Sequence, residues 1–188
     1  MLKIMMTNSE HVKKIFQSGS KEQKIQSLES LSNTTNVEVL QFIISMFDDN
    51  DIELRGEAFS ALLLNNNDIS DILIKNLNHS SKNVRGYCAL VLANRKDRVG
   101  IPKIIQLTND ESSMVRSCAV GALGHLRAYE ATPAIRKCLN DSNLEVKKSA
   151  IKSAIDIKDK DLLLSIETLK EMADPEIKNL IILARKNL

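Results

Sequence analysis

Apolar residues recur along the chain at the three- and four-residue spacing of helices that bury one side. The clearest stretch begins at Val115, and its apolar positions fall on one face of a helix: Val115, Ala119, Ala122, Leu123 and Leu126. A loop at residues 127–130 follows, and a second helix is expected from about Ala131, because Pro133 suits the first turn of a helix. This stretch therefore predicts two helices joined by a short loop.

The same helical pair is repeated along the chain. An aliphatic residue followed by a cation recurs at a nearly constant interval of about 30 residues, in the pairs Leu54-Arg55, Val84-Arg85, Val115-Arg116, Val146-Lys147 and Ile177-Lys178. Pro102 also stands one such interval before Pro133. A period of this length in a chain rich in helix formers predicts a solenoid, in which each helical pair packs against its neighbours.

The unit at residues 110–140 resembles HEAT repeats, in particular the short variety also called phycobilisome-lyase-like HEAT repeats. The resemblance rests on Asp110, Val115, Arg116, Ala119, Ala122, Leu123, Gly124, Leu126, Ala131, Pro133 and Ala134. It covers roughly residues 20–188 and weakens toward both ends. It implies an all-α fold, a right-handed α-α superhelix of about five helical hairpins with terminal capping helices.

The repeats also predict how the chain is divided. We expect a single domain at residues 1–188, with an N-terminal cap in 1–19, helical repeats in 20–170 and a C-terminal cap in 171–188. The first cap is expected at about Ser9–Gln17, and the last helix is expected to begin at Pro175 after Asp174. The inter-helix loops should lie along one edge: 32–36, 65–68, 95–100, 127–130 and 158–161.

Composition narrows the function classes. The 188 residues include no Trp and only 3% aromatic residues, which predicts an aliphatic core. The net charge of +2, from 26 basic and 24 acidic residues, gives no strong field for nucleic acid or an anionic membrane. Without an apolar run of about 20 residues or a signal-type start, the sequence predicts a soluble, cytoplasmic protein.

Equivalent positions of successive repeats form rows, so candidate sites are sought as rows. In HEAT arrays the second helices line the concave surface, and the resemblance implies that two adjacent rows lie there: Ser45, Lys75, Gln106, Lys137 and Thr168, beside Phe42, Ile72, Lys103, Ala134 and Ser165. This mixture of polar, basic and a few exposed apolar residues is typical of a protein-binding groove, although a solvated face without a ligand explains it equally well. The candidate protein-binding residues are Lys75, Lys103, Gln106, Arg136 and Lys137.

Two further rows favour structural roles. The resemblance implies that the cations of the repeated pair bond the acidic residues of the inter-repeat turns, which are Asp49, Asp110 and Asp141. Asn78, Asn109 and Asn140 end three second helices, and Asn terminates helices well because it tolerates the left-handed conformation. The alternative for this row is that of related armadillo arrays, where asparagines hold the backbone of an extended peptide.

A basic edge is the secondary candidate site. It comprises Arg95, Lys96, Arg98, Arg127 and Tyr129, which lie in two successive loops. The edge could meet an acidic partner or a phosphate, since Arg and Tyr are common interface anchors. Most charged loops are merely solvated, so both interpretations stay open.

The sequence offers no residues for a catalytic, cofactor or metal site. Some HEAT enzymes, such as deoxyhypusine hydroxylase, hold iron with His-Glu pairs, and none of His11, His79 and His125 is followed by Glu. The cysteines Cys88, Cys118 and Cys138 have neither zinc nor disulfide spacing, and we expect them to fill core space.

The function that the sequence favours is a non-enzymatic scaffold or adaptor. We expect a monomer that binds another protein through its concave face, with an inhibitor or immunity-type protein as a narrower version. The alternatives are a bilin lyase or isomerase of the same repeat type and a DNA-binding HEAT-like protein. Few aromatic residues and nearly balanced charge disfavour both alternatives.

Overall fold

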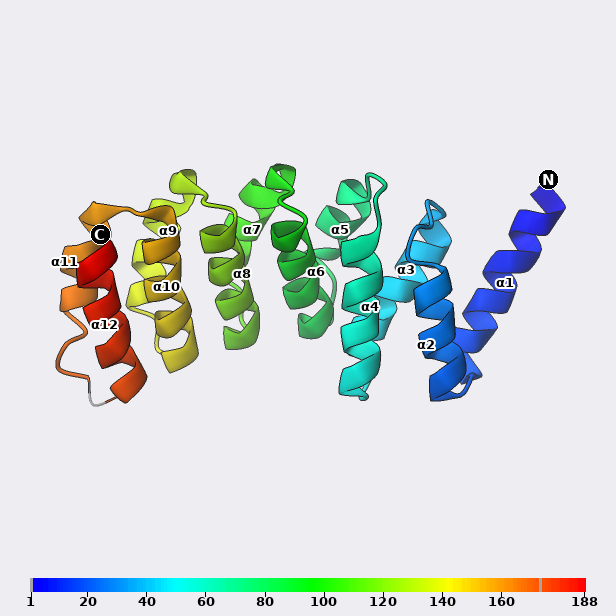
Figure 1. The fold of residues 1–188 in the computed structure, drawn as a ribbon, viewed down its shortest axis with the longest axis horizontal. Coiled ribbons are helices and arrows are strands. Elements are labelled where there is room, and N and C mark those ends of the chain that lie inside the picture. The colour runs from blue at the N-terminus through cyan, green and yellow to red at the C-terminus, as the bar shows by residue number, and fades with distance from the viewer. Residues whose placement is uncertain (1, 173) are drawn as a thin grey trace. The chain divides into compact units, whose positions relative to one another are not determined.

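The computed structural model describes residues 2–172 and 174–188, with side chains from residue 9 onward. All regular structure in these residues is helical, which confirms the all-α prediction (Figure 1). Contacts group the chain into two compact units, one up to Val91 and one from Leu92 onward. We describe each unit by itself, and the expectation of a single domain stays a prediction.

The N-terminal unit begins with a capping helix that is longer than predicted. Helix α1 spans Leu2–Ser18 and packs against α3, so the helix starts well before the expected Ser9. The elements that follow are α2 (Lys21–Ser30), α3 (Val37–Ser45), the 3-10 turn η1 (Met46–Asp48), α4 (Ile52–Leu64) and α5 (Ser70–Asn76). Helix α6 (Lys82–Asn94) begins in this unit and crosses its boundary.

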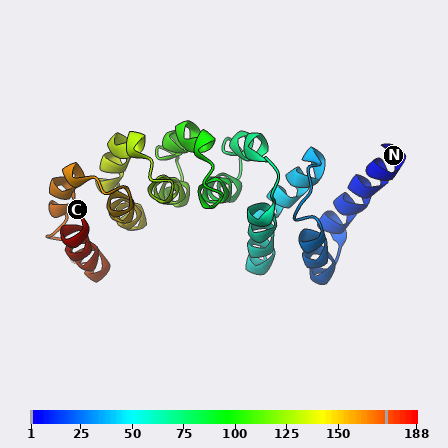
Figure 2. The ribbon, with the colours of Figure 1, turned by 45° about the horizontal axis from the view of Figure 1, so that its top comes forward.

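The C-terminal unit alternates short and long helices. Its elements are η2 (Arg98–Gly100), α7 (Ile101–Leu107), α8 (Ser113–His125), η3 (Tyr129–Ala131), α9 (Thr132–Leu139), α10 (Leu144–Ile157), η4 (Lys160–Leu162), α11 (Leu163–Glu167) and α12 (Pro175–Asn187). Helices α8, α10 and α12 stack in one layer, and α7, α9 and α11 form the other (Figure 2). The structure therefore contains the five predicted helical pairs, from α2 to α11, between the capping helices α1 and α12.

The repeated aliphatic residue anchors each first helix in the core. Val84, Val115, Val146 and Ile177 are fully buried, and Leu54 is nearly so. The cation that follows cannot share this direction, because consecutive helical residues point about 100° apart. In α4, α6, α8 and α10 one dipeptide therefore supplies both a core contact and a polar contact at the start of the helix.

Helix α8 approaches α10 so closely that one position admits only glycine. A Cβ built on Gly124 would stand 2.6 Å from Cα of Ser153, whereas Gly121, one turn earlier, has nothing within 4 Å. The buried Ser153 hydroxyl donates to the Val120 carbonyl at 2.7 Å across the same contact. Gly124 thus sets the distance between these two helices.

The ends of three first helices differ from the sequence expectation. Among the described residues, the non-glycine residues with positive φ are Lys96 (59°), Arg127 (49°) and Lys158 (56°). They occupy equivalent positions of three successive repeats. Asn78, Asn109 and Asn140 do stand where second helices end. The left-handed conformation expected of them is wrong, since Asn140 has φ −102° and neither Asn78 nor Asn109 has a positive φ. The described second helices end without a left-handed residue, whereas the first helices α6, α8 and α10 are followed by left-handed cations.

Candidate functional site

The primary candidate site lies on α7 and α9 of the C-terminal unit. We call it the second-helix face and define it by Lys103, Gln106, Asn109, Arg136 and Lys137. Lys103 is half-buried and the other four residues are exposed. The short helices present these side chains because their opposite sides are buried, at Ile104 and Ile135.

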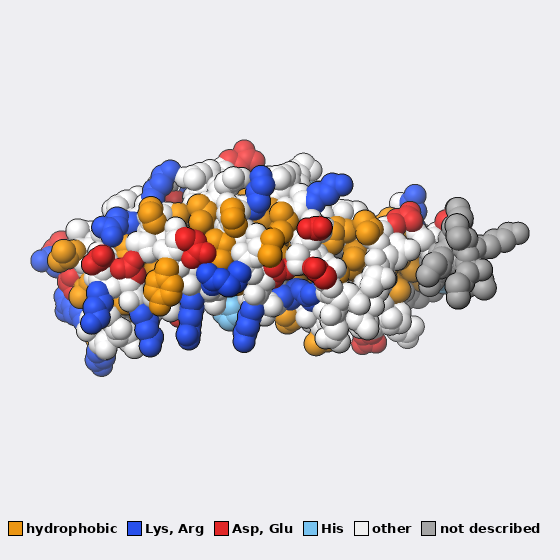
Figure 3. Space-filling view, turned by 90° about the horizontal axis from the view of Figure 1, so that it is seen from above, with side chains coloured by type: hydrophobic (Ala, Val, Ile, Leu, Met, Phe, Trp, Pro, Cys, Tyr) orange, Lys and Arg blue, Asp and Glu red, His pale blue; other side chains and the backbone are white. Residues whose placement is uncertain are grey.

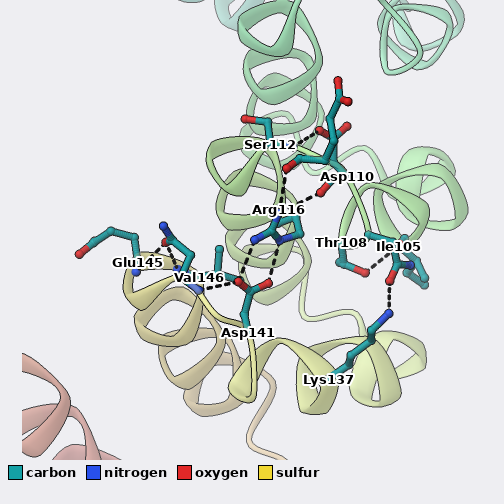
Figure 4. A network of polar contacts seen from close by, with 12 residues as sticks. Ile105, Thr108, Asp110, Ser112, Arg116, Lys137, Asp141, Glu145 and Val146 are labelled. Carbon is teal, nitrogen blue, oxygen red and sulfur yellow. Dashed lines mark hydrogen bonds and ion pairs between the residues drawn. The ribbon is translucent and has the colours of Figure 1, made fainter. Parts of the chain in front are cut away.

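The amines and amides of the second-helix face bond one another. Lys103 Nζ donates to Gln106 Oε1 at 3.2 Å, within α7. Lys137 Nζ donates to Asn109 Oδ1 at 2.5 Å, which links α9 to the turn after α7 (Figure 4). The arrangement joins two of the predicted rows, since Asn109 comes from the asparagine row and Lys137 from the basic one.

Apolar surface accompanies these polar groups. Ile105 and Ala134 are half-buried on α7 and α9, and Leu164 at the start of α11 is 80% exposed. The Arg136 guanidinium forms no hydrogen bond or ion pair with any residue that the structure describes. The second-helix face therefore offers an uncommitted cation beside apolar area, a combination common at protein interfaces.

The N-terminal unit carries the other members of the predicted rows. Lys75 is exposed on α5, and Ser45 is exposed with its hydroxyl donating to the Phe42 carbonyl at 2.7 Å. Phe42 is half-buried, and Ile72 is only 9% exposed. The expectation that Ile72 adds exposed apolar surface is wrong, because this side chain belongs to the core of its unit.

Four of the cations that follow the aliphatic residues bond within the fold, as Figure 4 shows for Arg116; they are Arg55, Arg85, Arg116 and Lys147. Arg116 Nη1 donates to the carbonyls of Asp110 and Glu111 at 3.0 and 3.1 Å. Its Nε and Nη2 donate to the Asp141 carboxylate at 2.7 and 2.8 Å. This guanidinium lowers the pKa of the Asp141 carboxyl below its usual value, and the pair ties α8 to the turn before α10.

The structure also shows which cation each of the predicted acidic residues Asp49 and Asp141 binds. Arg55 and Arg85 each donate to two carbonyls of the turn preceding their own helix. The Asp49 carboxylate accepts instead from Lys24 at 3.3 Å, an interval of 25 residues, as between Arg116 and Asp141. The carboxylate therefore belongs to the turn of the following repeat and connects neighbouring repeats.

A half-open hollow of about 560 Å³ lies at the basic edge. Its lining residues come from the ends of α8 and α10 and from the loops that follow α6 and α8: Lys96, Arg98, Gly124, His125, Leu126, Arg127 and Asp156. Three of the five predicted edge residues thus come together, while Arg95 and the exposed Tyr129 do not line the hollow. On the part of Figure 3 that holds the C-terminal unit, Lys and Arg side chains lie along both margins of the view.

Two polar residues of the lining were not among the predicted edge residues. His125 and Asp156 occupy equivalent positions in successive repeats, at the ends of α8 and α10. An alignment of the repeats at this position would have shown that both residues lie close to the row of Lys96 and Arg127, which comes two residues later in each repeat. This row was overlooked because its residue type changes from each repeat to the next.

The cysteines occupy packed positions. The three thiols are free, Cys88 and Cys138 are buried, and Cys118 is half-buried. Burial raises the pKa of the Cys118 and Cys138 thiols to about 11 and that of Cys88 further. Thiols of this kind are unreactive near neutral pH because the thiolate is the nucleophile.

The described residues contain no group of three or more His, Cys, Asp and Glu arranged to hold a metal ion. Within that same part of the chain, no helix combines the length and the apolar character that crossing a membrane demands.

Comparisons with known proteins agree with this architecture. The sequence matches the profile of HEAT repeats over residues 70–155 and 101–184. No curated protein sequence matches it.

Similar folds occur in a natural lyase complex and in designed proteins. The complex of CpcE and CpcF of phycocyanin lyase from Nostoc sp. PCC7120 contains a chain with 18% identity and a TM-score of 0.63, covering 79% of this chain and 64% of that one. This chain thus spans less than two thirds of that relative. A designed armadillo repeat protein in complex with the peptide (KR)4 has 20% identity and a TM-score of 0.55, covering 99% and 93%. At these identities the likeness concerns the fold alone.

Proposed function

Because the chain belongs to the HEAT-repeat family, we propose that it is a non-enzymatic scaffold that binds another protein through its second-helix face. The observation that carries the proposal is the mixed character of that face: an Arg136 that bonds none of the described residues, a polar pair of Lys137 and Asn109, and apolar surface beside them. Interfaces of soluble proteins combine these elements, with Arg among the preferred anchors.

The second-helix face suits a partner that carries acidic groups and groups that form hydrogen bonds with side-chain amides. Lys103, Arg136 and Lys137 bring three positive charges to α7 and α9, and the described part of these two helices carries no carboxylate. Gln106 and Asn109 add amide groups that bond a peptide backbone or polar side chains. The partner surface is therefore expected to be acidic, with the amides fixing its position.

Likeness to a designed armadillo protein supports the general role but not this preference. That protein binds (KR)4, a basic peptide, whereas the second-helix face described here is itself basic. The shared fold supports recognition along repeated helices, and the charge of the residues on those helices determines the partner.

The test is affinity capture from lysate of the source cell, with mass spectrometry of the bound proteins. We expect a stoichiometric protein to be captured by the wild-type chain and lost with the Lys103→Glu, Lys137→Glu double variant. A matched control is Lys178→Glu, Lys186→Glu, which makes the same charge change at exposed positions of α12. Capture that survives the first variant, or is lost equally with both, contradicts the assignment to this face.

The same preparations distinguish the two alternative classes. A bilin lyase would take up a tetrapyrrole and change its absorbance on titration. A DNA-binding protein would retain duplex DNA at low salt and release it steeply as salt rises. Either result, without a captured protein, contradicts the scaffold proposal.

A further inference from the structure

The hollow at the basic edge is lined by two cations that bond nothing in the described part of the chain. The side chains of Lys96 and Arg127 form no hydrogen bond or ion pair with any residue that the structure describes. Arg98 is committed, since its guanidinium donates to the Leu126 carbonyl and to Glu130 Oε1 at 3.1 Å. The hollow therefore has two uncommitted positive charges, held beside a third that is already neutralised.

These two cations occupy positions where lysine and arginine are unfavourable. Each follows a helix end in the left-handed conformation, where glycine is the usual residue because a Cβ is strained there. The backbone bonds of the two ends correspond: Lys96 and Asp97 donate to Ala93 and Leu92, and Arg127 and Ala128 donate to Gly124 and Leu123. From these two turns the side chains of Lys96 and Arg127 line the hollow.

The other lining groups define what the hollow can accommodate. His125 is exposed and adds a ring N–H donor, while Asp156 contributes one exposed carboxylate. The volume of about 560 Å³ lies within the range of roughly 300–1,000 Å³ that is common for small-ligand sites. A single inorganic anion would leave most of this space empty.

We propose that this hollow is a second binding site, which recognises a phosphate monoester group through Lys96 and Arg127. A phosphate monoester carries a charge of about −1.5 to −2 at neutral pH, which matches the two cations, whereas a carboxylate matches only one. Arg binds two phosphate oxygens through its planar fork, and Lys serves as a compact point charge. The proposal does not depend on the second-helix face, because none of the residues that define that face lines the hollow.

The left-handed positions allow an unusually clean test. Lys96→Gly and Arg127→Gly each remove a charge while placing the residue best suited to that conformation. Folding should therefore be retained, with Tm within about 3 °C of the wild type. Lys158→Gly is the matched control, because Lys158 has the same conformation and charge but does not line the hollow.

The measurement is a titration of the ¹⁵N-labelled chain with inorganic phosphate at constant ionic strength, followed by amide chemical shifts. We expect saturable shifts at residues 96–98 and 124–127 for the wild type and for Lys158→Gly. Each of Lys96→Gly and Arg127→Gly should weaken phosphate binding by about tenfold. Asp156→Asn should strengthen it, because it removes the repelling charge.

Two ligand sources share this chemistry, and further titrations distinguish them. Tighter binding of O-phospho-L-serine than of phosphate would indicate a free small ester. Tight binding only of a serine-phosphorylated peptide, with no binding of its unphosphorylated form, would indicate a modified protein. Absence of saturable shifts with every probe, or equal weakening by Lys158→Gly and the two lining variants, would overturn the proposal.

Discussion

Asp141 shows how one side chain connects two repeats. Its carboxylate accepts two hydrogen bonds from Arg116 and a third from the Asn143 backbone N–H at 2.8 Å. Its side chain is only 11% exposed, so water competes weakly for these bonds. The same carboxylate therefore orders the turn before α10 and fixes the start of α8 against it.

We predict that Asp141→Asn lowers the free energy of unfolding by about 2 kcal/mol at pH 7, because charge-assisted hydrogen bonds are lost. Arg116 depresses the folded-state pKa of Asp141, so its contribution is present above the unfolded pKa and is lost as pH falls through the folded value. Urea unfolding should thus show the difference shrinking below about pH 4. The control is Asp156→Asn, which changes an exposed carboxylate and should have little effect on stability both at pH 7 and below about pH 4.

Two glycines of α8 provide a matched pair at the residue scale. Gly124→Ala should destabilise the chain by about 1–3 kcal/mol, because the new Cβ would collide with the Ser153 backbone. Gly121→Ala should stabilise it by up to about 1 kcal/mol through helix propensity alone. Thermal unfolding followed by circular dichroism measures both, and equal effects would disprove the close approach of α8 and α10.

The helix starts show why equivalent positions are not equivalent in energy. Asn143 caps α10 by accepting from the backbone N–H groups of Glu145 and Val146 at 3.0 and 3.3 Å. Ser112, one repeat earlier, stands at the same place before α8 but forms no side-chain cap bond. Both starts share an aspartate that accepts from the backbone N–H of this residue, Asp110 from Ser112 at 2.9 Å and Asp141 from Asn143 at 2.8 Å, so the cap of α10 is an additional contact.

Substitution by alanine should separate these two helix starts. Asn143→Ala is expected to cost about 1 kcal/mol, because two backbone donors lose their acceptor. Ser112→Ala should change stability by less than about 0.5 kcal/mol. Chemical unfolding of the two variants at one pH decides the matter, and a larger effect at Ser112 would contradict the assigned caps.

Elements were predictable where the sequence repeats a packing pattern. Buried residues such as Val115 and Val146 recur with their cations, so the order of the helical pairs followed from periodicity. The left-handed cations at Lys96 and Arg127 were not predicted, because residue preferences favour Gly or Asn there. The hollow was predictable only in part, since Asp156, near the end of α10, joins it through the packing of α10 against α8.

At the scale of the whole molecule, a nearly balanced net charge conceals local differences. The chain has a net charge of +2, yet α7 and α9 present Lys103, Arg136 and Lys137 without a carboxylate in either helix. Binding at this face should therefore depend on local charge, and it should weaken with rising salt. The hollow is lined by other residues, so the account predicts two sites that can be disrupted independently.

The most direct test of the scaffold account is the dissociation constant of the captured partner, measured by isothermal titration calorimetry at fixed salt. We expect Lys103→Glu, Lys137→Glu to raise this constant by about tenfold or more, and the control Lys178→Glu, Lys186→Glu to leave it unchanged. An unchanged constant for the first variant, with its helical content intact, would show that the second-helix face does not bind the partner.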